Sequence, residues 1–438
     1  MKQPIKIAVI CLARKTFDYE AAKEIYRNIQ EDLKKIEFVD WIIISDLIIE
    51  IKEAKKVALT LASKNIDALI CVSGTFALGH LILEVNKQIR VPILLWGLNE
   101  LPYDGGKIRL NSICGVNLNA SNLYKGGIRN FHIVLGNKIN SDWIDAIRIK
   151  KALSNSHIGI IGYRAKGFFN LDIDQLDLYK EIGVLIDHFE LNDVFSFPID
   201  KMNIEKRRIQ IKSIFNVSEI TEEQLLKVSE LTVKFDAFMT HFNLDAIAIR
   251  CWPEFASDYG ISPCAAMSIL QSENKILTCE GDILGSLSML AHRALGAETP
   301  FLADFSQVDS NENFGLLWHC GVAAYNLWDG TCIRSLDTYF AGGKGVTADF
   351  VIKAGEVSMA RIDYAPGEYR IYLQKAQGIP MEKKLKGTYI KVKFEKPIKE
   401  VIKRIMYNGI AHHISVVLGN YIKPFEIFAK IQGWKIIK

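Results

Sequence analysis

The stretch IKIAVICLA, residues 5–13, is the first of several short apolar runs that alternate with amphipathic segments. Residues 19–36 carry apolar side chains at the spacing of a helix. The runs VDWIIISD (39–46), IDALICVSG (66–74) and VPILLWG (91–97) follow at intervals that leave room for further helices. Because strands that alternate with helices build parallel sheets covered on both faces, the first third of the chain is predicted to form a doubly wound α/β domain.

A second α/β unit is predicted from SHIGIIGYRAKGFF (156–169) onward, with a helix near residues 221–242 and buried strands at LDAIAIRC (244–251) and ILTCEGD (276–282). After about residue 305, strand-like segments and turns replace the helical periodicity. The last stretch, residues 409–437, is expected to be a loop with two histidines, a helix and a final strand. The fold class is therefore α/β, with two doubly wound parallel-sheet domains followed by a β-rich C-terminal domain. The predicted boundaries are 1–155, 156–304 and 305–438.

Two polar loops of the first domain, SGTFALGH (73–80) and WGLNELPYDGG (96–106), follow predicted strands. Ligands of parallel sheets bind beyond the carboxyl ends of strands. Both loops are equally consistent with the lining of a site and with ordinary turns.

The composition is that of a globular protein, with 49% apolar and 24% charged residues among 438. A formal net charge of +4 gives no support for nucleic-acid binding. No run of apolar residues has the length of a membrane span, and the apolar N-terminal run lacks a cleavage site. The eight cysteines form no CxxC pair. They are expected to be reduced thiols of a cytoplasmic protein without nucleic-acid or membrane partners.

Four polar features interrupt apolar sequence. Glu280 follows ILTC, Asp304 follows PFLA, His319 lies in LLWHCG, and His412 and His413 lie in GIAHHIS. Each has an ordinary explanation alone, since carboxylates cap helices and a histidine beside tryptophan is usually part of a core. Together they offer the oxygen and nitrogen ligands that suit Mn²⁺, Mg²⁺ or similar ions. Because unpaired buried carboxylates are costly, the combination predicts a divalent metal site.

The segments around these residues resemble the superfamily of L-fucose isomerases and L-arabinose isomerases, and more narrowly the shorter fucose-isomerase-like proteins. The resemblance covers most of the chain, and its C-terminal half carries the specific motifs. Weaker support comes from the first two predicted domains, in GTFALGH, VPILLWG and GYRAKGFFNLDID. The specific motifs are RCWPEF (250–255), CEGDILGSLSML (279–290), FLADF (301–305), LWHCG (317–321) and AHHIS (411–415).

The resemblance implies that Glu280, Asp304 and His413 bind Mn²⁺, or another divalent cation such as Mg²⁺ or Co²⁺. His319 matches the region of a further histidine ligand in arabinose isomerases, and is expected to be either a ligand or a substrate contact. The chain is shorter than the two named enzymes, and its second carboxylate is an aspartate, as in fucose isomerases, which leaves the sugar open. The resemblance also implies a homo-trimer or homo-hexamer, in which a neighbour's N-terminal domain covers the site.

The implied reaction is aldose–ketose isomerisation of an open-chain sugar through a cis-enediol. Glu280 and Asp304 act as catalytic acid and base, and which of them is the base stays open. We predict that polar groups on loops contact the substrate. For Trp252, packing in the core is an equally good explanation. If the substrate carries an anionic group, either Arg164 or Arg250 is expected to bind it through two hydrogen bonds. The predicted contacts are His319, Arg164, Arg250, Trp252 and Glu254.

Two alternatives remain beside the isomerase. The first is a non-catalytic sugar-binding or regulatory protein, because tandem α/β domains also resemble periplasmic binding proteins. The second is a metal-dependent sugar epimerase on the same scaffold, which would return the proton to the carbon that lost it. Asp282, two residues after Glu280, is expected to cap the following helix.

Overall fold

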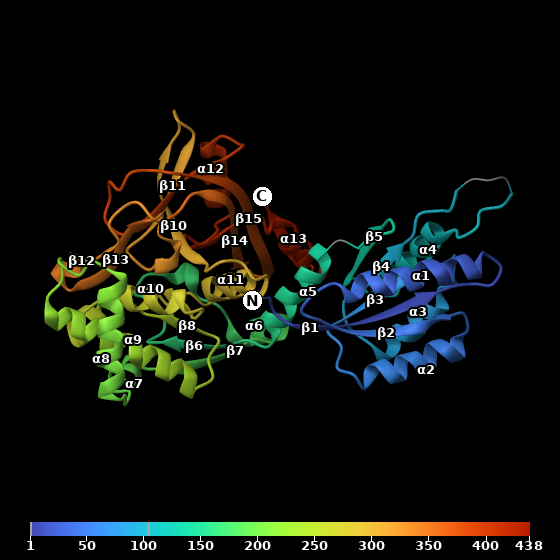
Figure 1. Ribbon diagram of the computed structural model, residues 1–438, viewed down its shortest axis with the longest axis horizontal. Coiled ribbons are helices and arrows are strands. Elements are labelled where there is room, and N and C mark those ends of the chain that lie inside the picture. The colour runs from blue at the N-terminus through green and yellow to red at the C-terminus, as the bar shows by residue number, and fades with distance from the viewer. Residues whose placement is uncertain (1, 103–105, 140) are drawn as a thin grey trace. The chain divides into compact units, whose positions relative to one another are not determined.

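The computed structural model describes residues 2–102, 106–139 and 141–438 (Figure 1). Part of the loop 96–106, residues 103–105, therefore lies outside the described residues. The chain forms two compact units. The smaller contains residues 2–151 and 423–434, and the larger contains 152–422 and 435–438. No helix within the described ranges is long and apolar enough to cross a membrane.

The smaller unit is a parallel sheet of order β2-β1-β3-β4-β5 with helices around it (Figure 1). Its first strand is buried at every position except Lys6, because the strand is interior to the sheet. Helix α13 belongs to this unit although its residues follow the β-rich region in the sequence. The strands are β1 Ile5–Leu12, β2 Val39–Ile48, β3 Ala68–Ser73, β4 Ile93–Gly97 and β5 Phe131–Leu135. The helices are α1 Tyr19–Lys34, α2 Ile51–Ala62, α3 His80–Gln88, α4 Ser112–Lys125, α5 Ser141–Ser154 and α13 Ile422–Gln432.

The larger unit contains a second parallel sheet, of order β7-β6-β8-β9. The helix predicted near residues 221–242 is present as α9, and Thr221 starts it with a capping box that includes Gln224. The strands are β6 His157–Ile161, β7 Leu185–Phe189, β8 Ala246–Ile249 and β9 Ile276–Cys279. The helices of this unit are α6 Gln175–Ile182, α7 Leu191–Phe195, α8 Lys201–Ile214, α9 Glu222–His241, α10 Cys264–Ser272, α11 Ile283–Ala294 and α12 Ile398–Tyr407.

The β-rich region of the larger unit is one nine-stranded sheet. Six of its strands, in the order β16-β11-β10-β17-β14-β15, close into a barrel because β15 also pairs with β16. The fold class is thus confirmed, with two parallel-sheet α/β parts followed by a β-rich part. The strands are β10 Phe301–Asp309, β11 Phe314–His319, β12 Ser335–Phe340, β13 Gly345–Val351, β14 Gly355–Ala365, β15 Glu368–Ile379, β16 Thr388–Lys393, β17 Ile414–Leu418 and β18 Lys435–Ile437.

The loop with two histidines, the helix and the final strand expected at the end of the chain are present, as residues 409–413, α13 and β18. An additional strand, β17, lies between the histidine pair and the helix and was not predicted. The segment ISVVL is rich in β-branched residues, which favour a strand, and it pairs with both β10 and β14.

Helix α11 connects the parallel sheet to the barrel. It contacts β8 and β9 of the sheet and β14 and β17 of the barrel, so that Arg293 alone among its residues is not fully buried. The expected cap is present, because the Asp282 carboxylate accepts a hydrogen bond from the Gly285 N–H at 2.8 Å. The helix therefore fixes the end of β9 against the barrel.

Candidate metal and sugar site

Loops at the carboxyl ends of three neighbouring strands carry predicted site residues. Arg164 follows β6, Arg250 follows β8, and Glu280 follows β9. These strands are parallel and adjacent, so their carboxyl ends meet at one edge of the sheet. This edge is where a ligand of such a sheet is expected.

The turn that carries Glu280 has an unusual backbone. Glu280 has a φ of 63° and Gly281 a φ of 76°, both in the left-handed region. A Cβ atom on Gly281 would lie 2.5 Å from the Tyr163 carbonyl oxygen, so only glycine fits there. The Ala165 N–H also donates to the Glu280 carbonyl at 3.1 Å. The turn after β9 is thus locked to the loop after β6, and a strained conformation held in this way is typical of functional sites.

The barrel supplies the other predicted ligands. Asp304 lies within β10, His319 ends β11, and His413 directly precedes β17, which pairs with β10. His413 Nε2 lies 3.6 Å from Glu280 Oε2 and 3.9 Å from Asp304 Oδ1. The two carboxylates and the histidine, which are far apart in the sequence, are therefore brought together.

Several polar atoms at this point have no hydrogen-bond partner. Asp304 Oδ1, His319 Nε2 and His413 Nε2 are buried and unpaired. Donor atoms of Asp304, His319 and His413 lie within 4.8 Å of one another, as do those of Glu280, His412 and His413. Leaving Asp304 Oδ1 and His413 Nε2 unpaired costs free energy, which a bound cation would recover. A set of carboxylate oxygens and imidazole nitrogens fits a divalent ion such as Mn²⁺.

The tautomer of His413 is set by a second carboxylate. His413 Nδ1 lies 2.9 Å from Asp282 Oδ2, and an ionised carboxylate only accepts hydrogen bonds. The hydrogen of a neutral His413 ring is therefore on Nδ1, and the lone pair of Nε2 faces Glu280 and Asp304. Asp282 caps α11 as predicted, and this second contact was not foreseen.

His319 has the opposite tautomer. Its Nδ1 accepts a hydrogen bond from the Cys320 N–H at 2.8 Å, so the hydrogen of the neutral ring is on Nε2. A nitrogen that carries hydrogen has no lone pair to offer a metal. Of the two roles expected for His319, the geometry favours donation of a hydrogen bond to a substrate.

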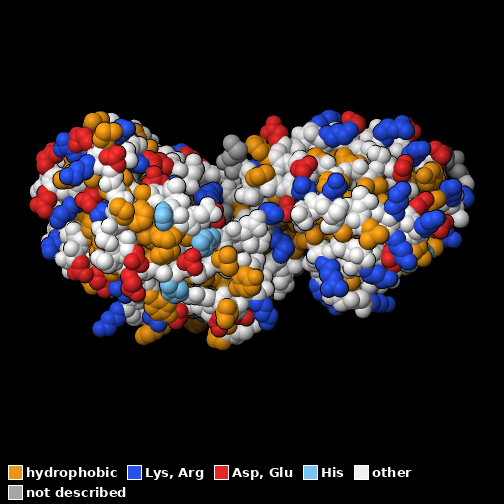
Figure 2. Space-filling model, turned by 90° about the horizontal axis from the view of Figure 1, so that it is seen from below, with side chains coloured by type: hydrophobic (Ala, Val, Ile, Leu, Met, Phe, Trp, Pro, Cys, Tyr) orange, Lys and Arg blue, Asp and Glu red, His pale blue; other side chains and the backbone are white. Residues whose placement is uncertain are grey.

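His412 is the partner of Glu280 on the open side of the site. His412 Nε2 lies 3.0 Å from Glu280 Oε2. Its side chain is 35% exposed, against 1% for His413. Burial raises the pKa of Glu280, but the hydrogen bond from His412 and the electrostatic interactions with the neighbouring histidines outweigh it and leave this pKa below its usual value. Burial lowers the pKa of His412, but the contact with Glu280 raises it overall. Figure 2 shows histidine side chains at the surface of the larger unit, beside apolar and acidic side chains.

The predicted contacts of the RCWPEF motif lie beside these histidines. The side chain of Trp252 packs edge-on against Phe168, with ring centroids 6.1 Å apart, and Phe168 in turn lies 5.4 Å from the His412 ring. Arg250 forms an ion pair with Glu254 at 3.2 Å. Phe168 was not predicted, although it lies in the GYRAKGFF segment that the resemblance had marked.

Arg164 lies over two aromatic rings. Its guanidinium carbon is 5.2 Å from the Tyr163 ring centroid and 4.8 Å from that of Phe169. Its Nε is buried without a hydrogen bond, and the closest carboxylate oxygen is that of Asp172 at 3.5 Å. A stacked and rigidly held guanidinium of this kind is suited to bind an anionic group.

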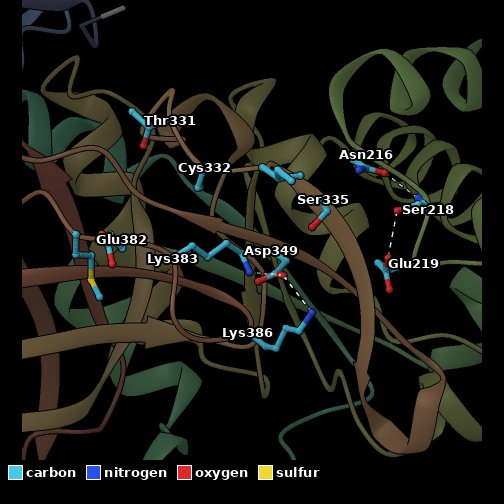
Figure 3. Close-up of a pocket in the computed structure, with 12 residues that line it drawn as sticks. Asn216, Ser218, Glu219, Thr331, Cys332, Ser335, Asp349, Glu382, Lys383 and Lys386 are labelled. Carbon is cyan, nitrogen blue, oxygen red and sulfur yellow. Dashed lines mark hydrogen bonds and ion pairs between the residues drawn. The ribbon is translucent and has the colours of Figure 1, made fainter.

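A separate pocket of about 600 Å³ lies in the larger unit, between the loop before α9 and the β15–β16 connection. Figure 3 shows Lys383 and Lys386 directed at Asp349. Lys383 pairs with Asp349 at 2.7 Å, and Lys386 pairs with Asp337. Both lysines of this pocket are thus already paired with buried carboxylates.

Comparison with known proteins points to sugar isomerases. Residues 8–142 match the family model of the fucose/sulfoquinovose isomerase N-terminal domain. Sulfoquinovose isomerases of Priestia aryabhattai and Priestia megaterium are each 28% identical to this chain over 430 residues, which cover 95% of both proteins. The sulfoquinovose isomerase of Alkalicoccus urumqiensis is 26% identical and covers 85% of this chain and 86% of its own.

Among solved structures, a solute-binding protein of Actinobacillus succinogenes with bound D-allose is 13% identical. It covers 66% of this chain and 88% of its own, with a TM-score of 0.19, too low to bear on the fold. The fold, the site and the related enzymes together define a sugar isomerase. The chain is similar to fucose/sulfoquinovose isomerases over most of its length, in line with the resemblance of its motifs.

Proposed function

We propose that the protein is a metal-dependent aldose–ketose isomerase of a sulfonated hexose, which converts sulfoquinovose or a close analogue to the corresponding ketose. The main support for a metal-dependent reaction is that the side chains of Glu280, Asp304 and His413 converge. Of these side chains, Asp304 Oδ1 and His413 Nε2 are buried without a hydrogen-bond partner. The names of the related enzymes supply the sugar.

Glu280, Asp304 and His413 would hold the cation. Their donor set is the one that Mn²⁺, Mg²⁺ or Co²⁺ accepts. When bound, the cation would polarise the oxygen atoms on C1 and C2 of the sugar and make the neighbouring C–H more acidic.

The two carboxylates would move the protons. Burial raises the pKa of Glu280, but the hydrogen bond from His412 and the other neighbouring histidines outweigh it and lower this pKa, which favours the ionised carboxylate, the form that accepts a proton. One carboxylate would remove the proton from C2 and return a proton to C1, while the other would carry the hydroxyl proton from the oxygen on C2 to the oxygen on C1, by way of a cis-enediol. His319 would donate its Nε2 hydrogen to a sugar oxygen. General acid–base catalysis of this type contributes about 10²- to 10⁴-fold to the rate.

Arg164 and Arg250 would bind the sulfonate. Both arginines have a buried Nε without a hydrogen bond, at the same edge of the sheet as Glu280. A sulfonate offers three acceptor oxygens, so a guanidinium can donate to two of them at once. Trp252 and Glu254, which pack beside Phe168 and Arg250, would contact the remaining part of the sugar.

The test is an isomerase assay with metal depletion. The protein is stripped with chelator, Mn²⁺, Mg²⁺ or Co²⁺ is restored, and sulfoquinovose is offered beside L-fucose, D-arabinose, L-arabinose and D-glucose. Metal-dependent ketose formation from sulfoquinovose alone is the expected result, with solvent deuterium incorporated from D₂O because a proton is exchanged. A C2-epimeric aldose without ketose would establish the epimerase instead. Binding of sugar without any turnover would establish the binding protein.

Two further features of the protein are also proposed. They comprise the division into domains 1–155, 156–304 and 305–438, and assembly as a homo-trimer or homo-hexamer with a shared site. Light scattering at several protein concentrations measures the assembly, and a monomer at micromolar concentration would contradict it.

A further inference from the structure

The buried surroundings of His413 include a carboxylate and a guanidinium that the proposed reaction does not use. Asp282 and Arg361 are both inaccessible to solvent, at 0% exposure, and the Arg361 Nη1 donates to Asp282 Oδ2. The same Oδ2 accepts from His413 Nδ1 at 2.9 Å. A buried ion pair is by itself a weak source of stability, so its presence beside His413 calls for another explanation.

We propose that Asp282 is a positioning residue that holds His413 with Nδ1 protonated and Nε2 free to bind the metal, with Arg361 as its buried counter-charge. This inference rests on the proposed function, because it gives His413 the role of a metal ligand. Histidines that bind metals ordinarily donate their other N–H to a carboxylate or carbonyl, and loss of that partner weakens metal binding about 10- to 100-fold.

Each oxygen of Asp282 has its own donor. Oδ1 accepts from the Gly285 N–H at 2.8 Å, while Oδ2 accepts from His413 and Arg361. An ionised carboxylate can accept a hydrogen bond from each of these three donors. An asparagine has one amide oxygen, so its NH₂ group must face either the Gly285 N–H or the pair of His413 and Arg361. In the second orientation the amide donates to His413 Nδ1, which moves the ring hydrogen to Nε2 and removes the lone pair from the metal site.

The charge of Asp282 is supported by further buried groups. Burial by itself would raise the pKa of Asp282, but the Arg361 charge and the His413 hydrogen bond outweigh it and hold this pKa well below its usual range. Arg361 also lies 3.8 Å from Asp363, and Asp363 accepts two hydrogen bonds from Arg370 at 2.9 and 2.6 Å.

This network of buried charged groups also binds the backbone near the histidines. Arg370 Nη2 donates to the Gly409 carbonyl at 3.0 Å, and Gly409 lies in the segment that leads to His412 and His413. The buried charges therefore fix both the ring and the chain that carries it.

The test compares two aspartate-to-asparagine variants. Asp349 is the matched control, because it is equally buried, accepts from the Gly387 N–H at 3.0 Å and pairs with Lys383 at 2.7 Å, without touching a histidine. Binding of Mn²⁺ to the metal-free proteins is measured by the electron paramagnetic resonance of free Mn²⁺, and thermal unfolding confirms that each variant is folded. Asp282→Asn is expected to bind Mn²⁺ about 10- to 100-fold more weakly than wild type. Asp349→Asn is expected to bind it within about threefold, since it leaves the ligands untouched.

Equal Mn²⁺ affinity of wild type and folded Asp282→Asn would overturn the positioning role and leave the proposed function standing. Absence of Mn²⁺ binding to wild type would overturn both. If Asp282→Asn does not fold, ¹⁵N NMR of histidine-labelled wild type decides the matter, with His413→Gln to assign the signals. A protonated Nδ1 and an unprotonated Nε2 in His413 are expected, and the reverse would overturn the inference.

Discussion

Replacement of Glu280 by glutamine isolates the charge of this side chain from its shape. Glutamine has nearly the same volume as glutamate, and it adopts the backbone φ of 63° with the same conformational strain. Its amide retains a hydrogen bond to His412, which lies 3.0 Å from the carboxylate in the wild type. The free energy of unfolding is therefore expected to change by less than about 1 kcal/mol. The variant can no longer take up a proton, and it is a weaker ligand for a divalent ion.

The expected loss in kcat is about 10³-fold at saturating Mn²⁺, from the middle of the range for general acid–base catalysis. This corresponds to about 4 kcal/mol of transition-state stabilisation. Ketose formation from sulfoquinovose is followed in parallel with Glu356→Gln, which breaks only a surface ion pair with Lys375 at 2.6 Å and should keep full activity. A Glu280→Gln enzyme within tenfold of wild type would refute the assignment of Glu280 to proton transfer.

Three further changes test the surrounding structure. Gly281→Ala places a Cβ 2.5 Å from the Tyr163 carbonyl oxygen at a positive φ, and should cost at least about 1–2 kcal/mol of stability and most of the activity, as read from thermal unfolding and turnover. Leu277→Ala, in the fully buried strand β9, should lower the free energy of unfolding by about 2–5 kcal/mol in urea titrations, and a loss below 1 kcal/mol would show that the core rearranges freely. Burial raises the pKa of Glu100, but hydrogen bonds from the Asn111 N–H and other backbone groups lower it below its usual value. Such a carboxylate stabilises the fold above its unfolded pKa and loses this effect as the pH falls through its lower folded pKa. Wild type should therefore exceed Glu100→Gln in stability at pH 7, by about 1–2 kcal/mol for the lost hydrogen bonds, and this difference should shrink as the pH falls below the usual pKa of glutamate; a difference that does not change with pH would contradict this.

Local periodicity was sufficient to predict the fold class. The alternation of apolar runs and helical segments predicted both parallel sheets, and the helix expected near residues 221–242 is present at Glu222–His241. Closure of the barrel was not predictable, because the β15–β16 pairing depends on contacts between strands rather than on either strand alone. Strand β17, which follows the histidine pair, was not predicted because the periodicity of a short apolar run does not distinguish a strand from a helix.

Glu280, Asp304 and His413 stood out in the sequence because each interrupts an apolar run, and the resemblance to fucose and arabinose isomerases then predicted them as ligands. Arg361 was missed, although it also interrupts the apolar run GEVSMARID. Its meaning depends on Asp282, which lies 79 residues away in the sequence and is brought to it by the packing of α11 against β14. A single sequence carries no record of such pairs, and the same is true of the contact between Phe168 and His412.

The assignment of α13 to the smaller unit has a consequence for how the protein is made. During synthesis, the sheet β1–β5 emerges first, but the helix that completes its unit is translated only after the whole parallel sheet β6–β9 and the barrel. Domains generally fold as they leave the ribosome, so this unit waits in an incomplete state while the other assembles. A fragment that ends at residue 151 would preserve that incomplete state, because it lacks Phe425 and Phe428, which are both buried in the finished protein.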